Sequence, residues 1–468
     1  MGDDYRIESD SLGEMQVPAD AYWGAQTQRA VENFPISGST FGRRFIRALG
    51  IVKKSAAQAN RDLGLLEEET AAAIVDAADE VIAGEHDDQF PVDVFQTGSG
   101  TSSNMNANEV IANRAAEIAG AEIGDRVVHP NDHVNYGQSS NDVIPTAMHV
   151  AALEAVEKDL IPGLETLRTA LEDAETEFDG VVKTGRTHLQ DATPIRLGQE
   201  FGGYRTQVEK GIKRVGDVRL HLRELALGGT AVGTGLNTHP EFPERAAEYI
   251  SEETNTTFRE ADNHFEAQAA HDAMAEAHGA LRTVAGSMNK IANDLRLLAS
   301  GPRNGLGEIE QPENQPGSSI MPGKINPVVA ESVNQVHKRV VGNDATISAG
   351  AARGEIDLNL YKPVLAHSFL ESAALLANAA EAFGEKFVAK LEANEEYCAE
   401  QVDRSMALAT ALNPAIGYDK ASKVAKRALA EDKTVREVAV DEGYLTEAEA
   451  DEVLDPERMT HRGILGDD

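Results

Sequence analysis

The segment Gly317–Pro327, with the sequence GSSIMPGKINP, brings several hydrogen-bonding and reactive side chains into one short stretch. It carries two serines, a lysine and an asparagine, and it joins two long helical patterns. These side chains, with backbone N–H groups that can turn inward, suit a loop that holds carboxylates and lowers the pKa of a serine hydroxyl. Because Gly317 and Gly323 can act as hinges, we expect this loop to close over a bound molecule. A plain interhelical loop is the alternative, which the ordered eleven-residue string disfavours.

A second group able to transfer protons is His188, within the segment Gly185–Pro194, GRTHLQDATP. A histidine considered alone is more often a hydrogen-bonded structural residue than a catalyst. The prediction that His188 is catalytic therefore depends on the surrounding segment. Glu331 lies on the first turns after the Gly317–Pro327 loop. It could orient a catalytic group, or it could be a carboxylate that the dipole of a helix N-terminus favours.

Metal and cofactor chemistry finds little support in the sequence. His129 and His133 have the spacing of metal ligands, but Pro130 argues against a helix that presents both. Gly228–Gly235 follows a helical pattern rather than a strand, which argues against dinucleotide binding. The single cysteine, Cys398, excludes an internal disulfide and a Cys-ligated iron–sulfur cluster. We therefore expect no metal and no cofactor.

The formal net charge is −35 at pH 7. Such a surface repels phosphate backbones and anionic lipids, so we expect neither nucleic acid nor a membrane as partner, and a site for a dianion must be locally basic. We interpret the charge as adaptation to high salt, which screens self-repulsion; an ordinary acidic mesophilic protein is the alternative. No apolar run approaches the roughly 20 residues that cross a bilayer, and Met1–Asp10 lacks a signal-peptide pattern, so we expect a cytoplasmic protein.

Long helices must position these segments. Between about Asp142 and Glu392 there are five long helical patterns, the first with a kink expected at Pro162–Gly163. An apolar seam with steps of three and four residues runs along one of them: Leu281, Val284, Met288, Ile291, Leu295 and Leu298. Helices of about 30 residues extend ~45 Å, which favours a bundle shared with other subunits over a monomeric bundle.

The length of 468 residues predicts two or three domains, and the low aromatic content of 5% suits helical cores. We predict a mostly α protein with a mixed, mainly helical domain over residues 1–138. A central long-helix bundle is expected over residues 139–395 and a small helical domain over residues 396–468.

The string GSSIMPGKINP resembles the signature of the fumarase/aspartase superfamily. Further segments extend the resemblance to class II fumarate hydratases along the whole chain: WGAQTQR (23–29), TGSGTSSNMN (97–106), HPND (129–132), SSND (139–142), GRTHLQDATP (185–194), LGGTAVGTGLN (227–237) and ALNPAIGYDK (411–420).

The resemblance implies a three-domain fumarase/aspartase-like fold whose five-helix bundle forms the core of a homotetramer, with active sites assembled from three subunits. It implies reversible, stereospecific hydration of fumarate to (S)-malate, a reaction of the tricarboxylic acid cycle, through an aci-carboxylate carbanion. The implied catalytic residues are His188, Ser318 and Glu331. The implied substrate-binding residues are Ser99, Gly100, Thr101, Asn104, Ser139, Ser140, Asn141, Thr187, Ser319, Lys324 and Asn326. A second dicarboxylate site is implied at Arg126, His129, Asn131 and Asp132, where a structured turn is the alternative.

We predict that Ser318, as an alkoxide in its amide-rich loop, takes the C3 proton of malate. His188, oriented by Glu331, then protonates the departing hydroxyl. The reverse assignment of the two protons stays open.

An aspartate ammonia-lyase is the alternative function, because it shares the signature loop. Gly323 and the triplet Ser139–Asn141 favour the hydratase, whereas Gln315, Val328-Val329, Val333–Val336 and Gly342–Asp344 lean toward the lyase. A structural protein that has lost catalysis is a further alternative, disfavoured because every expected catalytic residue type is present. Argininosuccinate and adenylosuccinate lyase activities are disfavoured by the HPND and TGSGT segments.

Overall fold

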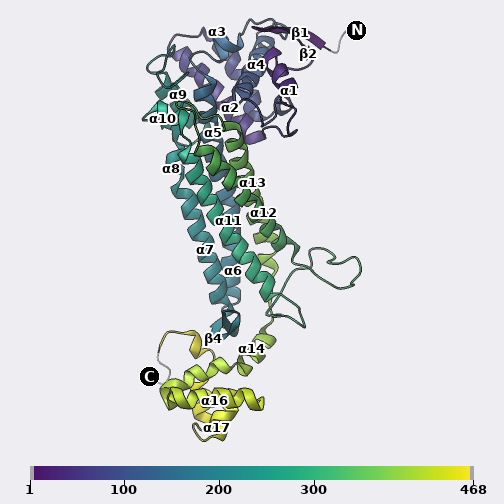
Figure 1. Cartoon of the computed structure of the whole chain (residues 1–468), viewed down its shortest axis with the longest axis vertical. Coiled ribbons are helices and arrows are strands. Elements are labelled where there is room, and N and C mark those ends of the chain that lie inside the picture. Colours follow the sequence, from purple (N-terminus) through teal and green to yellow (C-terminus); the bar gives the residue numbers. More distant parts are fainter. Residues whose placement is uncertain (1–4, 464–468) are drawn as a thin grey trace. The chain divides into compact units, whose positions relative to one another are not determined.

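The computed structural model describes residues 5–463, and helices dominate this part of the chain (Figure 1). Strands form four two-stranded pairs within it. The predicted mostly α fold class is therefore confirmed. A search of residues 5–463 finds no helix whose length and apolar character would let it cross a membrane.

The first elements are a hairpin and a group of packed helices. They are β1 (Tyr5–Asp10), β2 (Gly13–Pro18), α1 (Ala25–Asn33), α2 (Arg43–Asp62), α3 (Glu68–Ala83), η1 (Asp87–Gln89), α4 (Thr101–Ile118) and η2 (Pro130–Val134). Helix α2 is central, because it packs against α3, α4, α5 (Ser140–Glu154) and α9 (Phe242–Thr254). Its buried residues Phe45, Leu49, Val52 and Ala56 recur at steps of three and four, as one face of a helix requires.

The middle of the chain holds the longest helices. Its elements are α5 (Ser140–Glu154), η3 (Ala155–Leu160), α6 (Ile161–Glu177), β3 (Val182–Thr187), β4 (Gln190–Arg196), α7 (Leu197–Asp217), α8 (Arg219–Leu222), β5 (Glu224–Leu225), α9 (Phe242–Thr254), β6 (Arg259–Glu260), α10 (His264–Ala269), α11 (Asp272–Leu298), β7 (Ile309–Glu310), α12 (Val328–Ala351) and α13 (Lys362–Lys386). The predicted apolar seam is confirmed, since all six of its residues on α11 are buried.

The irregularity expected at Pro162 lies just before it. Residues Ala155–Leu160 form the wider turns of η3 between α5 and α6. A proline ring clashes with the carbonyl four residues earlier, so a local widening of the helix on its N-terminal side is the expected response.

The chain divides into two compact units. Unit 1 comprises Met1–Pro162, Lys213–Thr283 and Lys338–Ala377, and unit 2 comprises Gly163–Ile212, Val284–His337 and Asn378–Asp468. Helices α7, α11, α12 and α13 contribute residues to both. The domain boundaries near residues 138 and 395 stay a prediction.

Parts of five long helices lie side by side within unit 2 (Figure 1). Arg205 of α7 is bound to Glu175 of α6, and Tyr204 of α7 donates to Asp294 of α11. Asn334 of α12 bonds Asn289 of α11. A β-carbon at Gly384 of α13 would lie 3.0 Å from the α-carbon of Leu167 on α6, so these helices touch along their backbones. These contacts confirm the predicted five-helix bundle.

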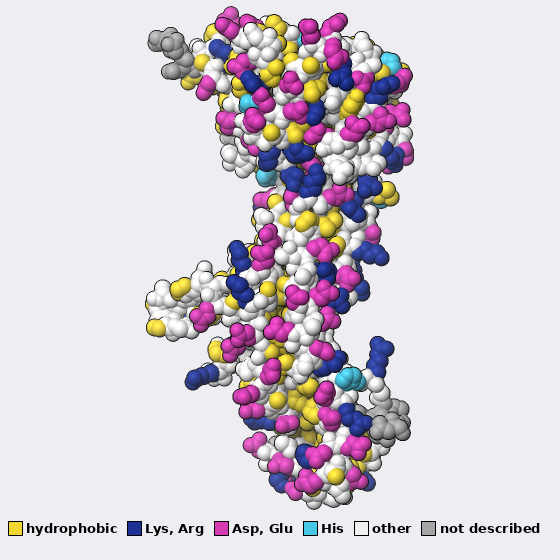
Figure 2. Space-filling view, turned by 180° about the vertical axis from the view of Figure 1, so that it is seen from behind, with side chains coloured by type: hydrophobic (Ala, Val, Ile, Leu, Met, Phe, Trp, Pro, Cys, Tyr) yellow, Lys and Arg dark blue, Asp and Glu magenta, His cyan; other side chains and the backbone are white. Residues whose placement is uncertain are grey.

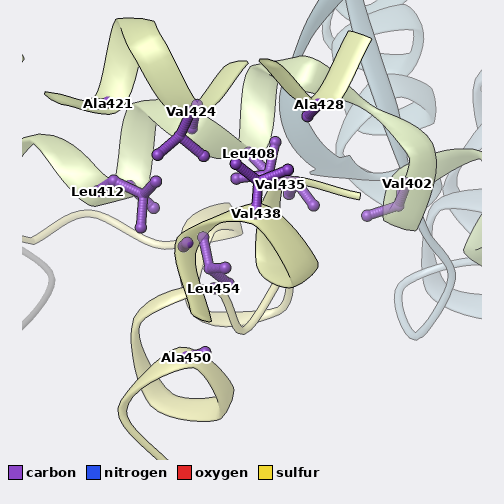
Figure 3. Close-up of a cluster of buried hydrophobic side chains, with 13 residues drawn as sticks. Val402, Leu408, Leu412, Ala421, Val424, Ala428, Val435, Val438, Ala450 and Leu454 are labelled. Atoms are coloured by element: carbon purple, nitrogen blue, oxygen red, sulfur yellow. The ribbon is translucent and has the colours of Figure 1, made fainter. Parts of the chain in front are cut away.

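The last elements enclose a small apolar core (Figure 3). They are η4 (Val388–Lys390), β8 (Glu392–Ala393), α14 (Glu395–Arg404), η5 (Met406–Leu412), α15 (Asn413–Ile416), α16 (Tyr418–Glu431), α17 (Val435–Asp441), α18 (Glu447–Val453) and η6 (Arg458–Thr460). Val424, Val435 and Val438 are among the buried residues of this core. Capping boxes at Thr434 and Thr446 begin α17 and α18, which supports helices of only two turns.

Three side chains of unit 1 have the order of a hydrolytic triad. His278 contacts Asp344 through Nδ1 at 3.0 Å and Ser372 through Nε2 at 2.9 Å. The Ser372 hydroxyl is buried and donates to the Ser368 carbonyl oxygen at 2.9 Å. A nucleophile must reach a substrate, so we interpret this cluster as a polar contact between helices rather than as a site.

Candidate functional site

The loop between α11 and α12 projects from the helices and carries the signature segment (Figure 1). The Ser318 Oγ accepts hydrogen bonds from the backbone N–H groups of Ile320 at 3.2 Å and Met321 at 3.0 Å. Hydrogen bonds to an oxygen favour its negatively charged form. The predicted amide-rich surroundings of Ser318 are therefore present, and they support an alkoxide at this position.

The two ends of the signature loop are fastened together. The N–H of Gly317 donates to the Lys324 carbonyl oxygen at 2.9 Å, and the Asn326 amide donates to the Gly317 carbonyl oxygen at 2.5 Å. A β-carbon at Gly317 would lie 2.1 Å from the Lys324 carbonyl oxygen. Only glycine allows this closure. Ser319 and Lys324 are exposed on the loop, and Ser318 is half-buried.

Replacing Gly317 with alanine is expected to open this closure and lower kcat/KM at least tenfold. The reason is that Ser318 and Lys324 would no longer be held at fixed positions relative to each other. Steady-state kinetics with fumarate would measure it. Gly180→Ala is the matched control, since a β-carbon at Gly180 meets nothing within 4 Å. Equal kinetics for both variants would contradict the expectation.

His188 stands at the tip of the β3–β4 hairpin. Thr187 pairs with Gln190, so His188 and Leu189 form a two-residue turn, and their φ angles are 56° and 59°. Two residues in the left-handed region are typical of the tight turn that joins twisted strands, although such turns usually use Asn and Gly. The turn holds the exposed His188 away from the strands, and Thr187 is exposed beside it.

Buried charges anchor the base of this hairpin. The Arg186 guanidinium donates to the Glu308 carboxylate at 2.7 Å, and the Lys183 ammonium lies 2.9 Å from the other oxygen of Glu308. Lys183 also donates to Glu200 at 2.8 Å. The Glu308 side chain is fully buried, so these ion pairs restrict the strand that leads to His188.

The predicted partners of His188 lie apart from it in the single chain. Glu331 is half-buried in the first turn of α12, where its N–H donates to the Pro327 carbonyl oxygen at 2.9 Å. Among residues 5–463, no hydrogen bond or ion pair joins His188 to Ser318 or to Glu331. The orientation of His188 by Glu331 stays a prediction.

Unit 1 contains a cavity of about 1170 Å³ that gathers much of the predicted substrate-binding set. Of that set, Thr101, Asn104, Ser139 and Ser140 line it. Asn131 and Asp132, predicted for a second dicarboxylate site, line the same cavity, whereas Arg126 and His129 do not.

Two helix N-termini meet this cavity, which suits it to an anion. Thr101 is the first residue of α4, and Ser140 is the first residue of α5. Ser139 caps α5 by accepting from the Asn141 N–H at 3.2 Å, while its own N–H donates to Asp142 at 2.8 Å. The positive ends of these helix dipoles and the hydroxyls of Thr101, Ser139 and Ser140 can hold a carboxylate.

Three further predicted binding residues, Ser99, Gly100 and Asn141, support this arrangement from its edges, whereas Thr187, Ser319, Lys324 and Asn326 belong to unit 2. Ser99 contacts the Thr101 hydroxyl at 2.8 Å. Gly100 has a φ of 81°, and a β-carbon there would lie 2.8 Å from Ile144, so this turn into α4 requires glycine. The Asn141 amide donates to the Ala231 carbonyl oxygen at 2.7 Å.

The segment predicted as a second dicarboxylate site is a structured turn in this chain. His129 Nδ1 accepts from the N–H groups of Asn131 at 3.2 Å and Asp132 at 3.1 Å. Arg126 donates to the carbonyl oxygen of Ser9. The role of these residues toward a second dicarboxylate stays a prediction. Within residues 5–463, no three His, Cys, Asp or Glu side chains gather as metal ligands.

Three buried ionisable residues lie beside the cavity, Lys53, Lys362 and Asp142, and they were not predicted from the sequence. Burial lowers the pKa of Lys53 and of Lys362 to about 7, and the nearby Asp142 opposes both shifts. Burial raises the pKa of Asp142 to about 6, against the N–H groups of Ser139, Thr230 and Gly228. No local pattern in the sequence marks these two lysines as buried.

Stability is expected to rise with pH above about 7 through these lysines. An unfolded lysine keeps its proton up to about 10.4, whereas the folded ones release it near neutrality. Unfolding in this window takes up protons, so raising the pH disfavours it. Apparent melting temperatures from pH 7 to 9 would test this, with a smaller gain expected for Lys53→Met. An unchanged pH dependence in that variant would contradict it.

A family model described as Lyase matches residues 13–342, and one described as Fumarase C C-terminus matches residues 408–461. A protein of Halobacterium salinarum named fumarate hydratase class II is 83% identical over 100% of both chains. One of Nitrosomonas europaea with the same name is 55% identical over 98% of this chain and 99% of its own.

A solved structure agrees with these relatives. The crystal structure of recombinant class II fumarase from Schistosoma mansoni has a TM-score of 0.94 to this chain at 39% identity, and the match covers 97% of this chain and 99% of that one. These matches cover 97% to 100% of the chain. This protein therefore belongs to the class II fumarate hydratase family.

Proposed function

We propose that this protein hydrates fumarate reversibly to (S)-malate, with Ser318 and His188 as the groups that move protons. The cavity of unit 1 carries the proposal most directly. There, the N-termini of α4 and α5 present Thr101, Ser139 and Ser140 to one space. Helix N-termini with hydroxyl donors are suited to the carboxylates of a small dianion.

In the dehydration direction, the Ser318 alkoxide takes the C3 proton of malate. The electron pair of the C–H bond moves onto the adjacent carboxylate and forms a dianionic aci-carboxylate. Lys324 and the hydroxyl and amide donors stabilise this charge, each plausibly by ~10²–10³ in rate. The pair then forms the C2–C3 double bond as the C2–O bond breaks, and His188 protonates the departing hydroxyl to water.

A homotetramer in which three subunits contribute to each active site is part of the proposal. His188 and Thr187 are exposed in the single chain, and Ser318 and Lys324 lie on a projecting loop, as expected of groups that face another subunit. Helix α12 supports it, because it exposes the small residues Gly342, Ala345 and Ala349 at steps of three and four. Such a stripe allows close helix–helix packing. We also propose that the protein is cytoplasmic.

The absorbance of fumarate's conjugated double bond provides the test. Purified protein in concentrated potassium chloride with a chelator would be given L-malate and, separately, L-aspartate. We expect absorbance to rise from malate alone. A rise from aspartate alone would overturn the proposal, and so would no rise from either.

The high-salt hypothesis yields its own expectation. The chain has 78 acidic and 43 basic residues, and Figure 2 shows acidic side chains spread over the face in view. Charges repel over ~30 Å at ~0.01 M salt but over only ~3 Å at ~1 M. We expect the oligomer to dissociate and most activity to be lost in the dilute condition, measured by light scattering with parallel assays. Full retention of both would contradict the hypothesis. The relative from Halobacterium salinarum fits it.

A further inference from the structure

Two fully buried lysines stand behind the wall of the unit 1 cavity. Lys53 of α2 and Lys362 of α13 are each 0% exposed. Within the described part of the chain, neither ammonium lies within ion-pair distance of a carboxylate, and the single buried Asp142 is the acidic group near both. Lysines are almost never fully buried unless paired, because removing an ammonium from water is costly. The burial of these two lysines is therefore costly, and we expect a function that offsets the cost.

Lys53 contacts two side chains that line the cavity. Its ammonium donates to Asn135 Oδ1 at 3.0 Å and to Gln138 Oε1 at 2.9 Å. Asn135 Oδ1 also accepts from the amides of Asn104 and Asn108, each at 3.2 Å. The Asn104 amide in turn lies 3.1 Å from the Ser140 hydroxyl oxygen. Lys53 thus fixes the orientation of the amides that position a predicted substrate-binding hydroxyl.

Lys362 contacts the first turn of α5 and the turn that precedes α4. Its ammonium donates to the Asn141 carbonyl oxygen at 3.1 Å, in the first turn of α5. Its backbone N–H donates to the Gly98 carbonyl oxygen at 3.2 Å, in the turn that leads into α4. A β-carbon at Gly98 would lie 2.0 Å from the Leu360 carbonyl oxygen, so this approach is close. One residue therefore joins the starts of α4 and α5.

The cavity has no lysine or arginine among its lining residues. Its acidic lining residue is Asp132, and the chain as a whole carries a net charge of −35. A dianion entering this space requires positive potential, of which the Lys324 side chain proposed above supplies one part and the wall of the cavity another. The helix N-termini supply part of it, and the ammonium groups of Lys53 and Lys362 are the buried cations that contact the lining.

We infer that Lys53 and Lys362 are positioning residues that make this cavity attractive to dicarboxylates, by orienting its amides and helix N-termini and by supplying its positive potential. The inference rests on the proposed function, since it concerns the same dicarboxylate site. Neither lysine lines the cavity, so each acts through Asn135, Gln138 or Asn141.

A purely structural role and a role in ligand binding predict different effects of replacing these lysines on stability. A lysine that holds the fold together should lower the melting temperature when replaced. A buried cation kept for ligand binding should leave it unchanged or raise it, because an apolar group of similar size is cheaper to bury. The two roles therefore separate when stability and ligand affinity are measured on the same variants.

The experiment compares the full chain with Lys53→Met and Lys362→Met at pH 6, below the pKa of about 7 of both lysines, in concentrated potassium chloride. Calorimetry with succinate as the probe measures the affinity for a dianion. The inhibition constant of butyrate measures the affinity for a ligand with a single negative charge. Fumarate kinetics and melting temperatures are recorded for each. Lys54→Met is the matched control, since Lys54 neighbours Lys53 on α2 but is paired with Asp79 and Glu253, each at 2.7 Å.

We expect both variants to bind succinate about tenfold or more weakly, the size expected when a unit charge leaves the wall of a partly buried site. The KM for fumarate should rise in parallel, while kcat stays within a few fold. The affinity for butyrate should fall less than that for succinate. The melting temperatures should equal or exceed that of the unaltered chain. Lys54→Met should bind succinate normally. If Lys53→Met does not assemble, Lys53→Gln keeps a donor to the same oxygens without the charge and makes the same comparison.

Unchanged succinate affinity in both variants would overturn the inference, as would equal losses for succinate and butyrate with a lowered melting temperature. Failure of the proposed function looks different, because the unaltered chain itself would then neither bind succinate nor hydrate fumarate.

Discussion

Replacing Ser318 with alanine is expected to lower kcat for malate dehydration by about 10²- to 10⁴-fold, the contribution typical of a positioned general base. The Ser318 hydroxyl oxygen accepts two backbone N–H groups, at 3.2 Å and 3.0 Å, which favour its charged form. Alanine removes the base but leaves Gly317 and Asn326 to fasten the loop. The KM should therefore change far less than kcat, and stopped assays at saturating malate would measure the loss.

Ser332→Ala is the matched control for this variant. Ser332 is an exposed serine on α12 whose hydroxyl donates to the Val329 carbonyl oxygen at 2.6 Å, and it is not among the predicted catalytic or binding residues. Its removal should leave kcat within a few fold. Near-normal turnover by Ser318→Ala would eliminate the hydroxyl as the base, however well the loop is formed.

Replacing His188 with asparagine is expected to lower kcat by a similar factor of about 10²–10⁴, because the departing hydroxyl loses its acid. Asparagine is the informative choice. His188 has a φ of 56°, a conformation that asparagine tolerates better than most residues, so the hairpin turn should persist. The loss can then be attributed to the imidazole and not to a distorted backbone.

The exposed His461 provides the control, since His461→Asn should keep normal kinetics. Hydrogen exchange at C3 of malate separates the two roles. Ser318→Ala should abolish exchange together with dehydration, whereas His188→Asn should retain exchange while releasing fumarate slowly. The reverse pattern would exchange the assignments of the two residues.

Several elements of the fold follow from local patterns in the sequence. The seam from Leu281 to Leu298 is buried as its spacing predicts, since a helix repeats every 3.6 residues whatever its surroundings. The widening of the helix before Pro162 is also local, because the proline ring acts on a carbonyl group of the preceding turn. The amide donors around Ser318 lie within three residues of it.

The sequence by itself determined the fold class, the long helices, the family and the residue types of the candidate site, because each depends on periodicity or on a contiguous motif. Tertiary structure alone decided which distant residues share the cavity, such as Thr101 with Ser140 and Asp132. It also decided that Lys53 and Lys362 are buried beside Asp142. Nothing local distinguishes these lysines from solvated ones, since the burial of an ammonium depends on the packing of segments far apart in the chain.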